Sequence, residues 1–398
     1  MNVLFVSNGE AEDMMALSLI RYWLYFNQED RVAALAIAGS GKTYVANDIP
    51  LVAPPMTMPS NGFAYLSFKM LFQDFEAGLI SHVKNQYKIL KKLAPQIDYV
   101  VGVGDIVPVI AAWILDKPTA FVGCAMSDYY LDPKNPKASS YSSTKISMLK
   151  KTRALVFPRD ELTTRNLQKL GVRAEYLGSP MMDCISYNKN LDLGLSKYSR
   201  VIGILPGSHD DRRENFKKIM DSVLRLNMKK PHTYLVAVSD KEDIPRYSKE
   251  LSKGNWYIQK TEPKHYLLKN NKDEIHLLHG YFGNVLMSSH VVIGASGTGN
   301  EQAVGIGIPT ISFPCGRIQY NRKFGESQKR LLGKALTYIP TAEPSIEALS
   351  KSIERAFNDN AYREEVKKIA LERFGEFGAS ERIVKRILGE INPQYVPY

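Results

Sequence analysis

The chain has few cysteines and no long uninterrupted apolar run. Its three cysteines, Cys124, Cys184 and Cys315, lie far apart without CxxC spacing or histidine partners. This argues against a disulfide framework and against a zinc site, and is typical of a reducing cytoplasm. The apolar run 99–124 is interrupted by charged residues and two prolines. We therefore expect no transmembrane helix, and the apolar strand that directly follows Met1 indicates no signal peptide.

Two nucleotide-binding signatures are missing. Residues 39–43 (GSGKT) resemble the end of a Walker loop, but Ala36 stands where that motif needs its first glycine, and Pro50 stops any long helix. A nucleotide hydrolase is therefore not expected. No DxD triplet occurs, so the usual metal–carboxylate contact with a nucleotide diphosphate is absent. We expect neither a metal site nor a cofactor.

Length and charge narrow the class of protein. At 398 residues, with 44% hydrophobic and 23% charged residues, the chain suits two globular domains. The net charge of +11 favours anionic partners. Because the basic residues are scattered, they also fit a solvated positive surface, and charge alone does not choose among nucleotides, nucleic acid and an acidic membrane surface. The partners that we expect are a nucleotide-sugar donor, a lipid or lipid-linked acceptor and an anionic membrane surface, and no nucleic acid.

Strand-like segments alternate with helical patterns along the chain, which is typical of the α/β class. The expected strands are 3–6, 32–36, 99–103, 119–122, 154–157, 201–205, 233–237, 275–278, 291–293 and 310–313. They predict two Rossmann-like domains with parallel sheets facing across a cleft. The domains are expected at 1–188 and 200–379, joined by the polar stretch 187–200, with a C-terminal helix in 380–398 that crosses back to the first domain.

Residues 291–314 are the most informative stretch. They predict a strand, a turn of small residues, a helix, a second turn and a strand. The small residues 294–299 would let an anion approach backbone N–H groups at the positive end of the helix. Glu301, in the first helical turn, would repel a phosphate above it and suits a neutral donor such as a ribose hydroxyl. The alternative is an ordinary βαβ crossover.

A second turn of this kind follows the expected strand 201–205. Gly207, Ser208 and His209 come directly after the strand and before a helical pattern, so their N–H groups would also face a ligand. His209 is either a phosphate contact or a solvated residue at the helix start.

The first half carries carboxylates at the corresponding edge of its sheet. Asp105 follows the strand 99–103, where it either accepts a proton from an acceptor hydroxyl or caps the next helix. Gly9 and Glu10 begin the first helix at the same edge and should line the acceptor side.

Large apolar residues are dense in 56–79. Phe68 and Phe72 belong to this segment, which has few charges. It indicates either a lipid-facing surface or packing between the domains.

Together these motifs resemble a GT-B glycosyltransferase, and within that class lipid A disaccharide synthase and its cyanobacterial-type relatives. Residues 7–13 (SNGEAED) are similar to the family's opening SGE-A-GD segment, and 205–208 (LPGS) to its LPGSR turn, with His209 in place of the arginine. Residues 296–301 (SGTGNE) resemble its SGT-x-x-E segment.

The resemblance implies an inverting, metal-independent transfer of a sugar from a nucleotide diphosphate donor, a UDP-sugar, to a hydroxyl of a lipid or lipid carrier. It implies that the first domain binds the acceptor and the second the donor. Asp105 would be the base, and the acceptor side would include Gly9, Glu10, Phe68 and Phe72. The expected donor-binding residues are Gly207, Ser208, His209, Arg212, Tyr281, Phe282, Ser296, Gly297, Thr298, Gly299, Asn300, Glu301, Gln319 and Gln328. The expected location is the cytoplasm, peripherally on the inner face of the plasma membrane.

Two other functions stay open. A nonhydrolysing UDP-sugar 2-epimerase shares this fold and nucleotide site. A non-catalytic nucleotide-sugar or lipid-binding protein is the third possibility, because His209 replaces the family's arginine.

Overall fold

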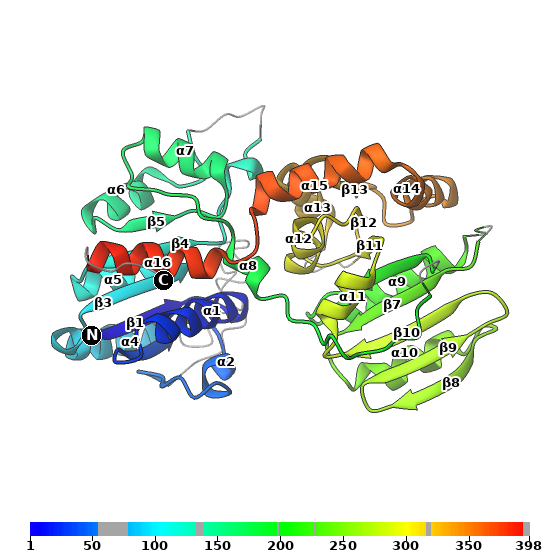
Figure 1. Ribbon diagram of the computed structural model, residues 1–398, viewed down its shortest axis with the longest axis horizontal. Coiled ribbons are helices and arrows are strands. Elements are labelled where there is room, and N and C mark those ends of the chain that lie inside the picture. The colour runs from blue at the N-terminus through cyan, green and yellow to red at the C-terminus, as the bar shows by residue number, and fades with distance from the viewer. Residues whose placement is uncertain are drawn as a thin grey trace. The chain divides into compact units, whose positions relative to one another are not determined.

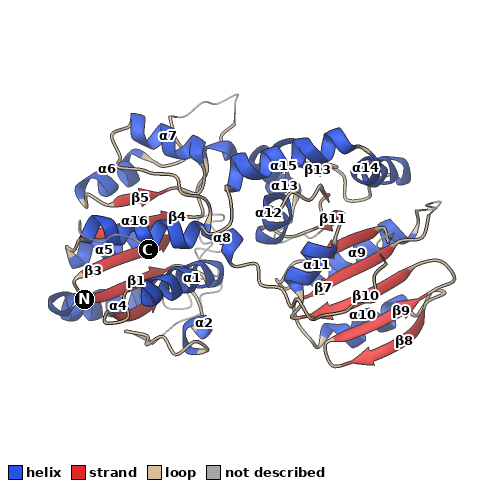
Figure 2. Cartoon of the chain, in the orientation of Figure 1, coloured by secondary structure: helices blue, strands red, loops and turns tan. Residues whose placement is uncertain are grey.

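The computed structural model describes residues 1–54, 79–132, 138–196, 199–226, 228, 230–315 and 320–392. The chain divides into two compact units, Met1–Cys184 with Phe374–Tyr398, and Ile185–Arg373. In both units helices alternate with strands, as Figures 1 and 2 show. The predicted α/β class with two Rossmann-like units is confirmed.

The first unit is built on a five-stranded parallel sheet with the strand order β2-β1-β3-β4-β5. Its strands are β1 (Asn2–Ser7), β2 (Arg31–Ala36), β3 (Tyr99–Gly104), β4 (Thr119–Gly123) and β5 (Leu155–Phe157). The helices are α1 (Glu10–Phe26), α2 (Lys42–Val45), α4 (Leu79–Leu93), α5 (Ile106–Leu115), α6 (Ser143–Lys151), α7 (Glu161–Lys169), α8 (Pro180–Asp183) and α16 (Ala379–Ile391). The connection from β1 leads to β2 on one side of β1, and the connection from β3 leads to β4 on the other side. The connections that leave β1 and β3 therefore diverge at the carboxyl end of β1.

Apolar strands account for the core of this unit. Residues 3–6 of β1 are fully buried, as expected of a parallel strand covered on both faces. Phe5 meets Trp23 of α1 edge to face, with ring centroids 5.9 Å apart, which holds α1 against the sheet. Helix α16 packs on α1, where the Ser18 hydroxyl donates to Ser380 at 2.9 Å.

The second unit contains an eight-stranded sheet with the order β13-β12-β11-β6-β7-β10-β9-β8. Its strands are β6 (Val201–Leu205), β7 (Thr233–Val238), β8 (Tyr257–Glu262), β9 (His265–Lys269), β10 (Glu274–His279), β11 (Val291–Gly294), β12 (Thr310–Ser312) and β13 (Leu336–Tyr338). The helices are α9 (Arg212–Leu224), α10 (Asp243–Leu251), α11 (Phe282–Ser288), α12 (Thr298–Gly305), α13 (Arg322–Leu332), α14 (Ile346–Asn358) and α15 (Asn360–Phe374). The six parallel strands have the strand order of dinucleotide-binding folds. Along the chain, β6 is the first of these six strands and its neighbour in the sheet, β11, is the fourth.

The sequence missed the antiparallel edge of this sheet. Strands β8 and β9 form a hairpin that pairs with β10, at the lower right of Figure 1. All six residues of β8 are exposed, so this strand lacks the alternation of apolar and polar residues by which a half-buried strand is predicted. The helix that follows residues 39–41, α2, has only four residues, whereas a Walker loop leads into a long helix.

Two histidines pair inside the sheet where this hairpin joins it. His265 of β9 and His276 of β10 are both buried, and His265 Nε2 lies 3.0 Å from His276 Nδ1. Burial, reinforced by the neighbouring His265 ring, holds the pKa of His276 well below its ordinary value of 6.5. The pair is therefore neutral at pH 7.

We expect this pair to make the second unit less stable in acid. As the pH falls below 6.5, residue 276 takes up a proton in the unfolded chain before it does so in the folded chain, so stability falls. Urea unfolding at pH 7 and pH 5 should show a larger loss for the wild type than for His276→Leu. Comparing the two proteins cancels the contribution of all other groups, and identical pH dependence in both would contradict the assignment.

Candidate functional site

The second unit has a pocket at the carboxyl ends of its central strands. Strand β6 lies between β7 and β11, and the two connections that leave β6 and β11 run in opposite directions at this point. In an open α/β sheet, this is where a ligand binds. The pocket has a volume of about 270 Å³ and is lined by Leu205, Gly207, Ser208, Ala237, Val238, Ser239, Leu278, Gly280, Phe282, Ser296, Thr298 and Gly299.

The turn between β11 and α12, residues 295–297, forms one wall. Gly297 occupies the N-cap position and α12 begins at Thr298. The first N–H groups of a helix have no acceptor within it, and the helix dipole makes this end positive. The Ser296 hydroxyl accepts from the N–H of Gly299 at 3.2 Å, which fixes the turn against the helix. An anion in the pocket would meet the N–H groups of Gly297 and Thr298.

The turn between β6 and α9, residues 206–211, forms the opposite wall. Gly207 has a φ of +92°, and a Cβ atom there would lie 3.2 Å from the carbonyl oxygen of Ala295, so glycine lets the two turns approach closely. Asn215 Nδ2 donates to the Pro206 carbonyl at 3.0 Å, and the Ser239 hydroxyl donates to the Gly207 carbonyl at 3.3 Å. This turn is thus held from two sides.

None of the described residues that line the pocket carries a charge. The groups offered to a ligand are backbone N–H groups and hydroxyls of Ser208, Ser239, Ser296 and Thr298, beside apolar side chains. Such a lining binds an anion through dipoles rather than through a cation.

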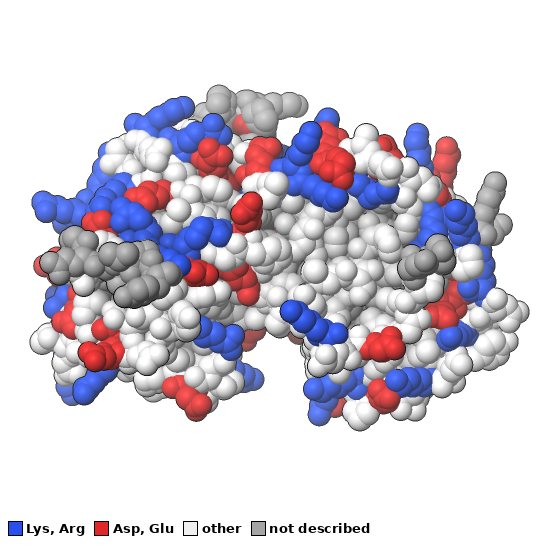
Figure 3. All heavy atoms as spheres, in the orientation of Figure 1, with Lys and Arg blue, Asp and Glu red and all other residues white. Residues whose placement is uncertain are grey.

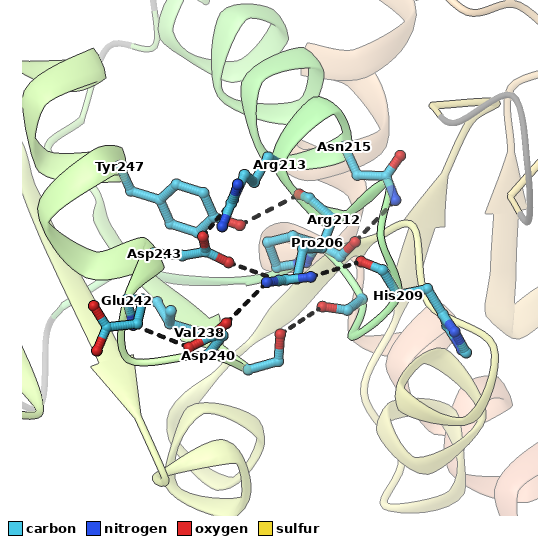
Figure 4. Close-up of polar contacts among 12 residues, drawn as sticks. Pro206, His209, Arg212, Arg213, Asn215, Val238, Asp240, Glu242, Asp243 and Tyr247 are labelled. Carbon is cyan, nitrogen blue, oxygen red and sulfur yellow. Dashed lines mark hydrogen bonds and ion pairs between the residues drawn. The ribbon is translucent and has the colours of Figure 1, made fainter. Parts of the chain in front are cut away.

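Carboxylates hold the arginine that begins α9. Arg212, the first residue of α9, donates from Nε to Asp243 at 2.6 Å and from Nη2 to Asp240 at 2.9 Å. Its Nη1 also donates to the His209 carbonyl at 3.3 Å, while the His209 ring points away from this cluster (Figure 4). Arg213 Nε binds the other oxygen of Asp243 at 2.5 Å. Asp243 is fully buried, so this cluster ties the β6–α9 turn to the start of α10.

The structure distributes the sequence-predicted donor residues over several positions in and around the pocket. Gly207, Ser208, Phe282, Ser296, Thr298 and Gly299 line the pocket, and Gly297 is the N-cap beneath them. Asn300, Glu301 and Gln328 are buried, and Tyr281 stands at the start of α11. Gln319, together with Phe68 and Phe72 of the predicted acceptor side, lies outside the described residues.

In the first unit, carboxylates gather at the carboxyl ends of β1 and β3. Asp105 caps α5, where its side chain accepts from the N–H of Val107 at 2.9 Å, and burial raises its pKa. Gly9 is the N-cap of α1, and Glu10 is exposed, accepting from the Ser40 hydroxyl at 3.2 Å. Burial, with the charge of Asp105, raises the pKa of Glu12 to about 7.

Asp13 lies deeper at the same edge. Its Oδ1 accepts from the Ser7 hydroxyl at 2.6 Å, and that hydroxyl is 2.6 Å from the hydroxyl of Tyr44. Burial raises the pKa of Asp13 to about 6. These contacts join β1, α1 and α2 at this edge of the sheet.

Several of these residues were not singled out from the sequence. Glu12 lies within the predicted acceptor stretch, but its raised pKa arises from burial and from Asp105, which is distant in the chain. Asp240 follows the end of β7 and Asp243 is the first residue of α10, and acidic residues between a strand and the start of the next helix were a signal that would have found them.

The surface charge is mixed in sign. On the face shown in Figure 3, Lys and Arg side chains are interspersed with Asp and Glu over both units. Across the described ranges, no His, Cys, Asp or Glu side chains form a group of three able to hold a metal ion. In the same ranges, no helix is both long and apolar enough to cross a membrane.

Comparison with known proteins identifies the fold. No family model matches the chain. Lipid-A-disaccharide synthase 2 of Legionella pneumophila is 21% identical over 213 residues in strain Paris and 22% over 216 residues in strain Philadelphia 1. Each match covers 48% of this chain and 51% of the relative, so the chain spans about half the length of the curated relatives it matches.

Solved structures match over the whole chain. A putative UDP-N-acetylglucosamine 2-epimerase from Listeria monocytogenes has a TM-score of 0.61 at 14% identity, covering 100% of this chain and 98% of its own. MurG of Acinetobacter baumannii has a TM-score of 0.61 at 12% identity, with 97% and 99% covered. UDP-GlcNAc 2-epimerase from Neisseria meningitidis, bound to UDP-GlcNAc, has 0.57 at 14% identity, with 98% and 100% covered.

The fold is GT-B. Glycosyltransferases and UDP-sugar 2-epimerases share this fold, and at these identities the likeness extends to the fold alone. The pocket between the β6–α9 and β11–α12 turns belongs to the second Rossmann-like unit of the GT-B chain.

We expect the carboxylate of Asp243 to be essential for the stability of this unit. Asp243→Ala leaves Arg212 and Arg213 without their buried partner, and should lower the free energy of unfolding by about 3 kcal/mol. Asp221→Ala removes an exposed ion pair with Lys217 in α9, the helix that begins with Arg212 and Arg213. This change should lower the free energy of unfolding by less than about 1 kcal/mol. Urea unfolding of both variants measures the difference, and equal costs would refute a structural role for the buried cluster.

Proposed function

We propose that this protein transfers a sugar from a UDP-sugar to a hydroxyl of a lipid or lipid-linked acceptor. The observation that carries the proposal is the pocket in the second unit, where two strand-to-helix turns present N–H groups and hydroxyls without a charged side chain among the described lining. Such a site suits a diphosphate that leaves during the reaction, because fixed dipoles stabilise the growing charge without reorganising.

The donor is assigned to the second unit. In the proposal the diphosphate lies on the β11–α12 turn and the β6–α9 turn, where the N–H groups of Gly297, Thr298 and Ser208 receive its oxygens. Glu301 accepts from the ribose hydroxyls, and Tyr281 and Phe282 cover the base. The UDP-GlcNAc bound to the Neisseria epimerase, a protein of the same fold, supports a nucleotide-sugar ligand.

The acceptor is assigned to the first unit. In the proposal Asp105 takes the proton of the acceptor hydroxyl, which attacks the sugar on the face opposite the diphosphate and inverts the anomeric carbon. Glu12 shares this edge of the sheet, and its pKa of about 7 suits a group that holds a proton near neutral pH. Gly9 and Glu10 complete the acceptor side, and no metal takes part.

A UDP-sugar 2-epimerase is the second candidate. It is favoured by the structural likeness to epimerases from Listeria and Neisseria over essentially the whole chain. The two activities differ in what they consume, because an epimerase converts UDP-GlcNAc without an acceptor, whereas a transferase releases UDP only when an acceptor is present.

Binding and turnover of UDP-sugars test the proposal. We expect UDP to raise the melting temperature of the wild type and lipid extracts to stimulate UDP release from a matching UDP-sugar. Glu301→Gln should weaken UDP binding about tenfold, whereas Glu326→Gln, at an exposed glutamate of α13, should not change it. Asp105→Asn keeps a capping side chain and should bind UDP normally but lose transfer.

Two results would contradict this assignment. Conversion of UDP-GlcNAc to its C2 epimer without any acceptor would favour the epimerase. Transfer by Asp105→Asn at the wild-type rate would remove Asp105 as the base.

A membrane surface is assigned to helices α4, α5 and α6 of the first unit, where α4 packs on α5 and α5 on α6. Trp113 of α5 is 46% exposed and lies under Lys151, 5.1 Å from its ring centroid. Tyr87 of α4 is likewise 46% exposed beside Lys91, and the neighbouring Lys150 is also exposed. Aromatic rings interleaved with lysines suit the headgroup region of an anionic bilayer. In the proposal this face holds the enzyme peripherally on the inner face of the plasma membrane.

Vesicle binding tests this surface. Lys151→Ala should weaken binding to phosphatidylglycerol vesicles about fivefold, because each basic residue near an anionic surface contributes about 1 kcal/mol. Trp113→Ala should weaken it further, whereas Tyr257→Ala, at an exposed tyrosine of the second unit, should have no effect. Equal co-sedimentation of the wild type and all three variants would overturn the assignment.

A further inference from the structure

A network of buried polar side chains lies beneath the β11–α12 turn. Asn300 of α12, Gln328 of α13 and Tyr320 are each at most 1% exposed. They come from separate parts of the second unit and meet under a wall of the pocket. Polar groups buried this deeply are costly unless their hydrogen bonds are complete, so their partners show what the network holds in place.

Gln328 uses both ends of its amide inside the protein. Its Nε2 donates to the carbonyl oxygens of Gly297 at 2.9 Å and Ser296 at 3.3 Å. Its Oε1 accepts from the Tyr320 hydroxyl at 2.6 Å and from Asn300 Nδ2 at 3.0 Å. Two donors and two acceptors are the full capacity of a glutamine side chain. The opposite amide orientation would place the oxygen against two carbonyls, so the network selects this one.

The contacts to two successive carbonyls decide which way the turn presents its N–H groups. In a trans peptide the C=O and the following N–H point in opposite directions within one plane. Because the Ser296 and Gly297 carbonyls face Gln328, the N–H groups of Gly297 and Thr298 point away from Gln328. Ser296 and Thr298 line the pocket, so the amide holds both N–H groups toward the ligand side.

Asn300 supports the strand end from which the turn departs. Its Nδ2 lies 3.2 Å from the Gly294 carbonyl, and the Ser312 hydroxyl donates to the same carbonyl at 2.5 Å. A Cβ atom at residue 294 would collide with Asn300 Oδ1, so only glycine leaves room for this side chain. The strand end and the turn are thus fixed by the same network.

We infer that Gln328 and Asn300 are positioning residues of the anion site and do not contact the ligand. The inference rests on the proposed function and concerns how that site recognises the diphosphate of its donor. Gln328 orients the N–H groups that receive the phosphate oxygens, and Tyr320 fixes the orientation of Gln328. The network therefore contributes to affinity for the diphosphate and not to affinity for the nucleoside.

The contribution of the network to diphosphate affinity is measured by a ratio, the dissociation constant of uridine divided by that of UDP. The ratio falls when binding of the diphosphate alone is weakened. Calorimetric titrations of wild type, Gln328→Glu and Tyr320→Phe at one salt concentration measure both constants. Gln328→Glu replaces the donor to the two carbonyls with an oxygen, and should lower the ratio about tenfold while uridine binds within about twofold of wild type. Tyr320→Phe removes one hydroxyl and should lower the ratio about threefold.

Tyr338→Phe is the matched control. The hydroxyl of Tyr338, in β13, donates at 3.2 Å to the carbonyl of Arg322 in α13, the helix that also carries Gln328. This hydrogen bond lies outside the network, so removing the hydroxyl should leave the ratio unchanged. Equal weakening of uridine and UDP by Gln328→Glu, or an unchanged ratio, would overturn the inference. If Gln328→Glu does not fold, an unchanged ratio in Tyr320→Phe overturns it alone. A wild type that binds UDP no more tightly than uridine would instead refute the proposed donor site.

Discussion

The site in the second unit depends on one constraint, the unpaired N–H groups at the start of a helix. A helix cannot satisfy its first N–H groups internally, and in a parallel sheet the helix starts gather at the carboxyl ends of the strands. At β6 and β11 two strand-to-helix turns are adjacent because the connections diverge there. The pocket and its suitability for an anion follow from this arrangement.

Two devices keep the turns in place, and they differ in chemistry. The β6–α9 turn is tied to α10 through ion pairs on the fully buried Asp243, whereas the β11–α12 turn rests on a neutral network of Asn300, Gln328 and Tyr320. The ion pairs engage Arg212, which the sequence predicted as a donor-binding residue. Binding is thereby left to backbone dipoles, while the net charge of +11 is distributed over the surface.

The fold does not choose between the two candidate reactions. Glycosyltransferases and UDP-sugar 2-epimerases share the GT-B fold. What separates them is the group that acts on the sugar, and fold alone does not specify such a group. In the first unit the strand order β2-β1-β3-β4-β5 brings Asp105 and Glu12 to one edge, which suits a proton acceptor and supports the transferase.

The sequence by itself determined the α/β class, the parallel strands and the two strand-to-helix turns, because buried strands are apolar runs and turns need small residues. It could not determine the exposed strand β8, whose residues carry no burial pattern. Tertiary structure alone decided that Arg212 pairs with Asp243, that Gln328 binds the carbonyls of the β11–α12 turn, and that Glu12 has a raised pKa. These properties depend on distances between residues remote in the chain, and local patterns of hydrophobicity and turn chemistry contain no information on such distances.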